Sequence, residues 1–580
     1  MKSARRILVM SLAVMAFVAC QKEDGVDRDG YLKLTVEGMN GGNKMAIDGV
    51  NSYWADGDVV NINGQECPVV FGDGGGAYTE ASDFDDAAAF YGVYPASIYA
   101  SNDGNSYTLT LPAEYTYATT EHSGTKQNLQ SPMVAYALPT ATELQFKHLT
   151  AAITVEVKND FGIDVRVTNV TISSNKYKLH GSVTVDVTSD LSSIVAVESA
   201  TASDRQVEMN FTGTPCVVAS GSTQQIQLPV LPVGDDNRFT ISVTVQNVDD
   251  AAMEYTFTKT QGDSQAAYAL GRAKMGFAPA KFGGVFSVAA DRQVRFAPGN
   301  LQYQASTGIW RFAQHQYDAI GNAAGNSVFD DSRSTQAAWI DLFGWGTSGW
   351  ENRDSNEGKD TIIYYRPYDY VGNIVGSSAY GYGPRHKEGY VYTYTFSLVG
   401  DYENSDWGVY NAISNGGNTA GQWRTLTGGT GKEWEYLMKT RGASTVSGVS
   451  NARYLKAKVN NINGYIIFPD DFILPEGIDI TNSQINISSY LAWTNVSSSL
   501  TSADWMKMEV AGAIFLPCTG YRSYSSNNPS FTADNGYYWS SSYYNAQNAY
   551  NIQMGGGSPM FDANSAKRIG CSVRLVRDVE

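Results

Sequence analysis

The chain is poor in the residues that most enzymes and metal sites use. Its 580 residues include only five histidines and five cysteines, and both types are scattered. No C-x₂-C pair occurs, so a zinc site built from clustered ligands is not predicted. The G-x-S-x-G, H-E-x-x-H, Walker A and G-x-G-x-x-G motifs are also missing. We therefore expect a protein without catalytic residues, metal or cofactor.

Positive charge and long apolar runs are scarce as well. Lys and Arg number 41 against 58 Asp and Glu, the net charge is −17, and basic residues cluster only near the N-terminus. Neutralising phosphates requires such clusters, so no nucleic-acid partner is expected. Beyond the first 20 residues no run of 18 apolar residues occurs, and nothing else is expected to cross a bilayer.

The first 24 residues have the layout of an export signal. Three basic residues precede an apolar stretch at 7–19, and Cys20 follows Ala19. This stretch is too short to span about 30 Å of hydrocarbon. The layout resembles a bacterial lipoprotein signal, which implies lipidation of Cys20; an ordinary secretory signal is the alternative. Residues 21–24 resemble the sorting signal of Bacteroidetes surface lipoproteins, which implies a location at the outer membrane. The lipid anchor would then be the only membrane contact.

The remaining composition favours strands and turns. Gly numbers 57 and Tyr 37, while charged residues make up 17%. Alternation predicts a first strand at 31–36 and a half-buried strand at 152–157, paired with neighbours at 165–172 and 182–187. Ten of the eleven tryptophans lie beyond residue 281, which indicates a differently built domain. One helix is predicted at 431–441, where Trp434, Leu437 and Met438 share a face.

Five short motifs, in order, resemble fimbrillin-like proteins, the lipoprotein precursors of Bacteroidetes pili. The motifs are Trp54-x-x-Gly-Asp58, Val93-Tyr-Pro95, Met133-Val-Ala135, Phe146-Lys-His-Leu149 and Leu228-Pro-Val-Leu-Pro232. The resemblance implies two tandem transthyretin-like β sandwiches, at 31–145 and 146–280, after a signal at 1–19 and a linker at 20–30. His148 is expected to be a packed residue at a strand start rather than a ligand.

The same resemblance implies assembly with other fimbrial subunits. In that family a protease removes an N-terminal strand after Arg or Lys, and a partner's strand replaces it by β-strand addition. Arg28 precedes the first predicted strand and Lys44 follows it. Cleavage at Arg28 would only release the lipid, whereas cleavage at Lys44 would also remove the strand. Either residue can equally be a solvated loop charge.

Three later motifs make residues 285–580 resemble the Fibrobacter succinogenes major paralogous domain, whose fold is similar to C-type lectins and to the formylglycine-generating enzyme. They are Phe515-Leu-Pro-Cys-Thr-Gly-Tyr-Arg522, Gly536-Tyr-Tyr-Trp-Ser-Ser541 and Gly570-Cys-Ser-Val-Arg-Leu-Val-Arg577. The resemblance implies an α+β domain in which the first and last motifs are neighbouring strands and Cys518 pairs with Cys571. Four cysteines besides Cys20 permit three pairings, which the sequence leaves open.

Aromatic residues are the candidate ligand contacts of this domain. The loop residues predicted to bind a ligand are Tyr521, Tyr524, Tyr537, Tyr538, Tyr543 and Tyr544. Trp434, Trp505 and Trp539 are expected to fill the core instead. The calcium-binding triplets of lectins are missing, so no metal is predicted.

Taken together, the sequence predicts a mainly β cell-surface lipoprotein. It would act as a tip or accessory fimbrial subunit that adheres through its C-terminal domain to a host, bacterial or glycan ligand. Proteolysis would release it from its anchor into a fimbrium. The alternative is a stand-alone surface lipoprotein that binds glycans and never joins a pilus.

Overall fold

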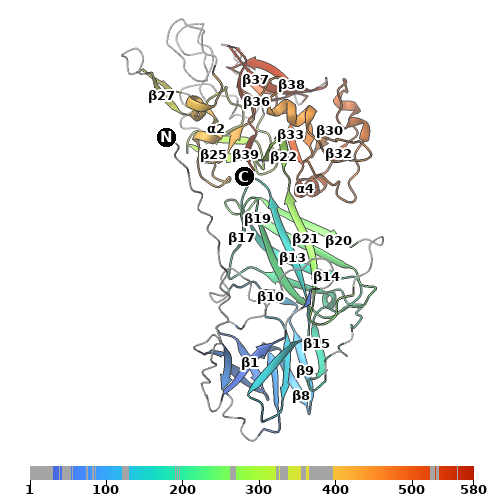
Figure 1. The fold of residues 1–580 in the computed structure, drawn as a ribbon. Coiled ribbons are helices and arrows are strands. Elements are labelled where there is room, and N and C mark those ends of the chain that lie inside the picture. Colours follow the sequence, from blue (N-terminus) through green and yellow to red (C-terminus); the bar gives the residue numbers. More distant parts are fainter. Residues whose placement is uncertain are drawn as a thin grey trace, which may run out of the picture.

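The computed structural model describes most of the chain beyond residue 30. The described residues are 31–579, with gaps at 38–39, 42–53, 55–56, 73–75, 81–83, 85–86, 120–129, 190, 192–193, 195, 262–268, 322–325, 327–336, 355–360, 365–395, 523–528, 531–533, 546, 558 and 568. The molecule is elongated and mainly β, as predicted, with the N-terminal strands at one end and the C-terminal domain at the other (Figure 1). Cys20, Arg28, Lys44 and Tyr524 lie outside the described residues.

The first sandwich is built on an eight-stranded sheet in the order β4-β3-β7-β11-β12-β1-β6-β5. Its strands are β1 (Tyr31–Val36), β3 (Val59–Ile62), β4 (Gln65–Pro68), β5 (Val70–Phe71), β6 (Ala77–Glu80), β7 (Phe90–Tyr94), β11 (Met133–Ala137) and β12 (Glu143–His148). The sheet curls so that strands near its two ends approach each other. The Thr79 hydroxyl of β6 donates to the Pro68 carbonyl of β4 at 3.0 Å across this junction. One apolar cluster, with Leu32, Leu34 and Phe146, fills the inside of this curl.

A three-stranded sheet covers the other face of the curled sheet. Its order is β15-β9-β8, formed by β8 (Tyr99–Asp103), β9 (Ser106–Leu111) and β15 (Gly181–Asp186). Val134, Leu109 and Val185 share the cluster between the two sheets. Since β15 comes from the predicted second unit, the boundary at residues 145 and 146 does not divide the strands cleanly.

The second sandwich also contains strands from both predicted units. One sheet has the order β10-β16-β14-β19-β20, with β17 beside β14, and the other has the order β18-β13-β21-β2. The bounds are β2 (Asn40–Gly41), β10 (Glu114–Thr116), β13 (Ala151–Asp160), β14 (Val165–Ser174), β16 (Gln206–Asn210), β17 (Cys216–Val218), β18 (Thr223–Val230), β19 (Phe239–Asn247), β20 (Glu254–Thr260) and β21 (Lys274–Gly283). The strand prediction at 152–157 is confirmed. Its predicted pairing is wrong, because β13 pairs with β18 and β21 while β14 lies in the opposite sheet.

Short sheets and a few helical turns make up the C-terminal domain. A four-stranded sheet has the order β22-β23-β39-β29, a second has the order β32-β30-β31-β33, and a three-stranded sheet has the order β36-β37-β38. Their bounds are β22 (Phe286–Ala289), β23 (Arg292–Phe296), β29 (Arg424–Thr425), β30 (Tyr454–Val459), β31 (Ile462–Ile467), β32 (Ser499–Leu500), β33 (Ile514–Pro517), β36 (Gly536–Tyr543), β37 (Asn548–Met554), β38 (Met560–Ala566) and β39 (Leu575–Asp578). Smaller pairings join β24 (Leu301–Gln304) to β25 (Ile309–Phe312) and β26 (Trp339–Ile340), β27 (Glu351–Asp354) to β28 (Thr361–Tyr364), and β34 (Tyr521–Arg522) to β35 (Pro529–Ser530).

The predicted helix at 431–441 is confirmed in part. It comprises α3 (Glu433–Glu435) and a π-helical turn, Tyr436–Thr440. The sequence reasoning missed α4 (Ser502–Val510), which is longer than α2 (Trp407–Tyr410) and α3. Thr501 and Asp504 form a capping box at its start, and this T-x-x-D spacing was the available signal. Among the described helices, none has the length and apolar character needed to span a membrane.

Large aromatic side chains fill the C-terminal core. The fully buried tryptophans are Trp345, Trp407, Trp423, Trp434, Trp505 and Trp539, which confirms the core positions predicted for three of them. Arg574 is also fully buried. Its guanidinium donates to the carbonyls of Phe515 at 2.6 Å and Ala297 at 3.0 Å, and therefore joins β33 to the segment that follows β23.

Candidate functional sites

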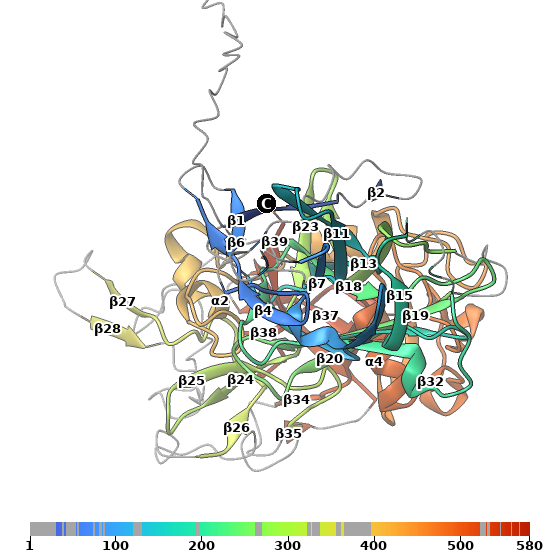
Figure 2. The ribbon, with the colours of Figure 1, turned by 90° about the horizontal axis from the view of Figure 1, so that it is seen from below.

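Strand β1 is an internal strand of the curled sheet, paired with a neighbour along both edges. It pairs in parallel with β12, where Lys33 is opposite Glu143, and antiparallel with β6, where Leu34 is opposite Ala77. Figure 2 shows β1 beside β6 on one side of the first sandwich. Removing β1 would therefore expose two strand edges, those of β6 and β12, in one groove.

Alternation along β1 decides which side chains enter the core. Leu32 and Leu34 are each 3% exposed and join the cluster of Trp54 and Phe146, while Lys33 points to solvent. Burying each leucine contributes about 1.5–3 kcal/mol. Val36 packs against the same cluster, and the Thr35 hydroxyl donates to the Glu143 carboxylate at 2.7 Å. Backbone pairing and an alternating apolar face therefore hold the strand, and another strand with the same pattern could replace it.

Glu37, directly after β1, ties the segment to the second sandwich. Arg272 donates from both terminal nitrogens to the Glu37 carboxylate, at 2.6 and 3.1 Å, and the His148 amide donates to it at 3.2 Å. Burial acts to raise the pKa of Glu37, but the hydrogen bonds and charge of Arg272 outweigh it, so this pKa lies below its ordinary value. Bidentate pairs of this kind are both strong and directional.

His148 packs beneath this ion pair, as predicted, although it ends β12 instead of starting a strand. Its Nδ1 lies 3.0 Å from the Ser131 hydroxyl, which is itself 3.1 Å from the Thr150 hydroxyl. Burial lowers the pKa of His148 to about 4, so the ring is neutral at physiological pH. The Arg272 guanidinium also donates to the His148 carbonyl at 3.0 Å, which completes a polar junction under the end of β1.

The chain then crosses to the second sandwich. Strand β2 pairs in parallel with β21, where Asn40 is opposite Lys274. Lys44 belongs to residues 42–53, which separate β2 from the buried Trp54. A cut after Lys44 would separate both β1 and β2 from the rest of the chain.

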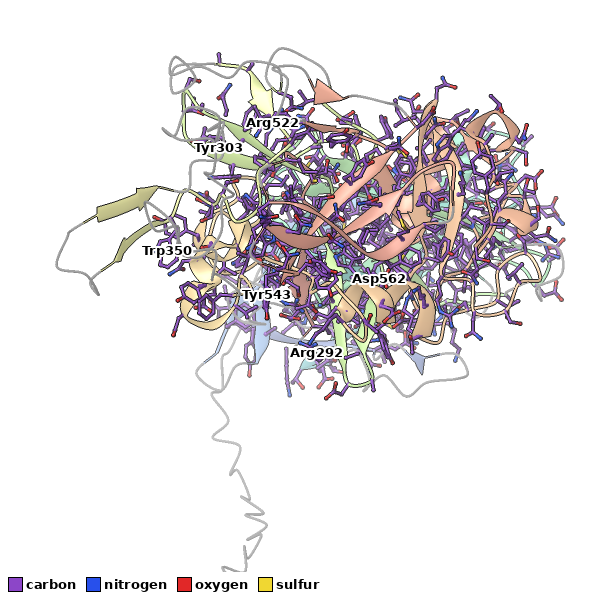
Figure 3. All side chains as sticks on the ribbon, turned by 90° about the horizontal axis from the view of Figure 1, so that it is seen from above. Arg292, Tyr303, Trp350, Arg522, Tyr543 and Asp562 are labelled. Atoms are coloured by element: carbon purple, nitrogen blue, oxygen red, sulfur yellow. The ribbon has the colours of Figure 1, made fainter. Side chains whose placement is uncertain are left out.

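The six predicted ligand-binding tyrosines do not form one loop. Tyr538 is fully buried, and its hydroxyl donates to the Pro517 carbonyl at 2.8 Å, so its predicted role as a surface contact is wrong. Tyr521 and Tyr537 pack edge to face, with ring centroids 5.0 Å apart. Tyr543 and Tyr544 lie at the other end of β36, about 20 Å away by strand geometry. Figure 3 likewise places Arg522, next to Tyr521, well apart from Tyr543.

Tyr544 is the predicted ligand contact with the greatest described exposure. It is 47% exposed and packs edge to face on Tyr550 with ring centroids 5.2 Å apart. Tyr543 is half-buried beside it. A small aromatic surface therefore remains available at this end of β36.

The predicted disulfide between Cys518 and Cys571 is wrong, because both are free buried thiols. The two strands are neighbours as the resemblance implied, but Arg522 is opposite Gly570. Extending this antiparallel register places Cys571 opposite Tyr521, about 10 Å along the strand from Cys518. Burial raises the pKa of both thiols well above its ordinary value, which disfavours the reactive thiolate.

Sequence reasoning missed Glu37 and Arg272. They are separated by 235 residues, and no local pattern links them. A carboxylate soon after an alternating strand was the only signal in the sequence.

Within the described ranges no group of three His, Cys, Asp or Glu side chains could hold a metal.

Comparison with known proteins gives no close relative. No family model matches the chain, and no curated protein matches it. A candidate cell adhesion protein from Bacteroides uniformis is 17% identical, covers 42% of this chain and 90% of its own, and has a TM-score of 0.23. A fimbrial protein from Bacteroides ovatus is 10% identical, covers 94% of this chain and 99% of its own, and has a TM-score of 0.21. TM-scores this low do not establish a shared fold.

Proposed function

We propose that this chain is a surface lipoprotein that becomes a tip or accessory fimbrial subunit and adheres through its C-terminal domain. The observation that carries the proposal is the position of β1 between β6 and β12, with Lys44 beyond it in the sequence. Loss of β1 would leave a groove lined by backbone donors, backbone acceptors and apolar side chains. Such a groove is what β-strand addition requires.

The position of the C-terminal domain supports a terminal or accessory place in the assembly. This domain is at the end of the molecule opposite β1 (Figure 1). It is fixed there by the Asn247 amide, which donates to the Asn415 carbonyl at 2.8 Å, and by the Arg295–Asp160 ion pair at 3.1 Å. A large domain held in this way would obstruct continuous shaft packing and leave its far surface free for a ligand.

The N-terminus of the mature protein tests the proposal. Mass spectrometry on cells should find acylated Cys20 in the membrane fraction and Met45 in a cross-linked, ladder-forming fraction. A terminus at Asp29 would mean that only the lipid is lost. Acylated Cys20 in every fraction, without a ladder, would overturn the fimbrial role.

A stand-alone glycan-binding lipoprotein is the second candidate. The exposed ring of Tyr544, supported by Tyr550, is the observation that favours it, because aromatic faces stack on sugar rings. Glycan-array binding by the full chain, lost in Tyr544→Ala and unaccompanied by ladders on cells, would favour this function over assembly.

We also propose that the protein is not an enzyme. Cys518 and Cys571 are buried thiols with raised pKa values, a setting that suits packing better than nucleophilic attack. Full retention of adhesion by Cys571→Ala is the expected result. A substrate turnover that this variant loses while it stays folded would refute the proposal.

A further inference from the structure

The segment 31–37 makes two kinds of contact, and each fixes its register. Leu32 and Leu34 enter the core of the first sandwich, and Glu37, three residues after Leu34, reaches Arg272, just before β21 of the second sandwich. The backbone pairing with β12 extends to the end of the segment, since the Glu37 amide donates to the Phe146 carbonyl at 2.8 Å.

A slip by one residue would break both contacts together. The leucines would turn to the solvent face, because side chains alternate along a strand. The carboxylate would also move by about 3.3 Å, which is more than the tolerance of a bidentate pair. The groove therefore accepts a strand only when two features match: its apolar residues alternate along the strand, and its acidic residue lies at the right distance from them.

Arg272 would be the chemically distinctive group left behind when the segment departs. Its side chain is 20% exposed and its second acceptor is the His148 carbonyl, so it is a fixed cation in a partly desolvated place. The pairing of Glu37 with the His148 amide would be lost as well. A partly buried cation without its carboxylate is costly, so an incoming strand that supplies one is favoured.

We propose that the groove left by β1 selects a partner strand that runs parallel to β12, with apolar residues at alternate positions, as Leu32, Leu34 and Val36 are in β1, and a carboxylate directly after the last of them. The carboxylate binds Arg272 and sets the register. This inference rests on the proposed function, in which β1 leaves and a strand of another subunit replaces it. A strand with a basic or amide side chain at the acid position is disfavoured.

Peptide exchange tests the selection on the full chain. A site-specific protease sequence is inserted after Lys44, the chain is cut, and labelled peptides spanning residues 29–41 are added. Fluorescence anisotropy and native mass spectrometry measure their binding. The Glu37→Gln peptide should bind about tenfold or more weakly than the native peptide, because it loses a charge-assisted bidentate pair.

The Asp29→Asn peptide is the matched control, since it loses the same charge outside the pattern. It should bind within about twofold of the native peptide. In a chain carrying Arg272→Met, the native and Glu37→Gln peptides should bind alike, which isolates the pair as in a double-mutant cycle. The peptide series on the native chain gives an answer even when the Arg272 variant does not fold.

The outcomes separate the two proposals. Equal binding of the native and Glu37→Gln peptides overturns the carboxylate rule but leaves strand replacement intact. Binding of no peptide, with residues 31–44 retained after the cut, overturns strand replacement and this inference together.

Discussion

His148 is a buried base whose protonation opposes folding. Its pKa in the folded chain is about 4, below the ordinary value near 6.5, because burial disfavours the charged ring. Between these values the unfolded chain binds the proton more readily, so the stabilising contribution is present above about pH 6.5 and is lost as the pH falls toward 4. Its full size is on the order of 3 kcal/mol.

Asp341, Asp406 and Glu509 act in the opposite direction, because burial raises the pKa of each carboxyl and its protonation favours folding as the pH falls. The expected result is therefore a difference: between pH 7 and pH 4.5 the native chain should lose on the order of 3 kcal/mol of the free energy of unfolding relative to a variant without His148, measured by urea titration at each pH. His148→Asn, which keeps an acceptor near Nδ1 but does not titrate, should lack this relative loss. His315→Asn, the same substitution at an exposed position, is the matched control. An equally steep curve in His148→Asn would contradict the assignment.

Substitution of Tyr538 should lower stability, whereas substitution of Tyr544 should weaken adhesion. Tyr538→Phe removes a buried hydroxyl bonded to the Pro517 carbonyl and to the Asn300 amide, at 2.8 and 3.2 Å, and should lower stability by about 1–2 kcal/mol without changing ligand binding. Tyr544→Ala should weaken adhesion at unchanged stability, because its ring is exposed. Chemical denaturation paired with a cell-adhesion assay separates the two effects, and a loss of adhesion in Tyr538→Phe alone would reverse the assignment.

Strand β1 should be the element whose packing controls release of the N-terminal segment. Leu34→Ala removes a side chain that is 3% exposed and should destabilise the first sandwich by about 2–5 kcal/mol. Lys33→Ala, one residue away on the exposed face, is the control and should cost little. After a cut at Lys44, the half-life of the bound segment, measured by native mass spectrometry, should shorten only in Leu34→Ala. Equal half-lives would show that burial of Leu34 does not control release of the segment.

Helix α4 depends on its capping box. The Thr501 hydroxyl accepts from the Asp504 amide at 3.1 Å, and Asp504 accepts from the Thr501 amide at 3.1 Å. Thr501→Ala should lower stability by about 1 kcal/mol, whereas the neighbouring exposed Ser502→Ala should be close to neutral. Urea midpoints measure both. A matching loss in Ser502→Ala would mean that the cap is not the cause.

Sequence patterns predicted the features that depend on neighbouring residues and missed those that depend on contacts between distant residues. Alternation at 31–36 and 152–157 is local, and both strands were found. The pairing of β13 with β21 joins residues more than 100 positions apart, and no local pattern contains it. The same holds for Glu37 and Arg272, and for the strand register that keeps Cys518 from Cys571. Tyr538 shows a further limit, because a tyrosine in a polar sequence can still be buried when its hydroxyl finds a carbonyl.

At the scale of the molecule, the second sandwich and the C-terminal domain share one hydrophobic core. Val155 and Phe282 of the sandwich belong to the same cluster as Trp423 and Val573 of the C-terminal domain. The backbones also meet closely there: Gly512 and Gly283 have φ of +93° and +77°. A Cβ on Gly512 would lie 2.7 Å from the Gly283 carbonyl carbon. Only glycine fits at this contact, since both the conformation and the space exclude a side chain.

The shared core predicts that the second sandwich and the C-terminal domain open together. Gly512→Ala adds left-handed strain of about 1–2 kcal/mol and an overpacking cost of about 1–3 kcal/mol at the junction. Hydrogen exchange followed by mass spectrometry should therefore speed up in β13 and β21 as well as in β23, while β3 and β7 of the first sandwich stay protected. Gly448→Ala is the control, because Gly448 has φ of +81° but open space around its Cβ position, so it adds the strain without the clash. Faster exchange confined to the C-terminal domain in Gly512→Ala would mean that the second sandwich and the C-terminal domain open independently, so that the C-terminal domain is not held rigidly relative to the sandwiches.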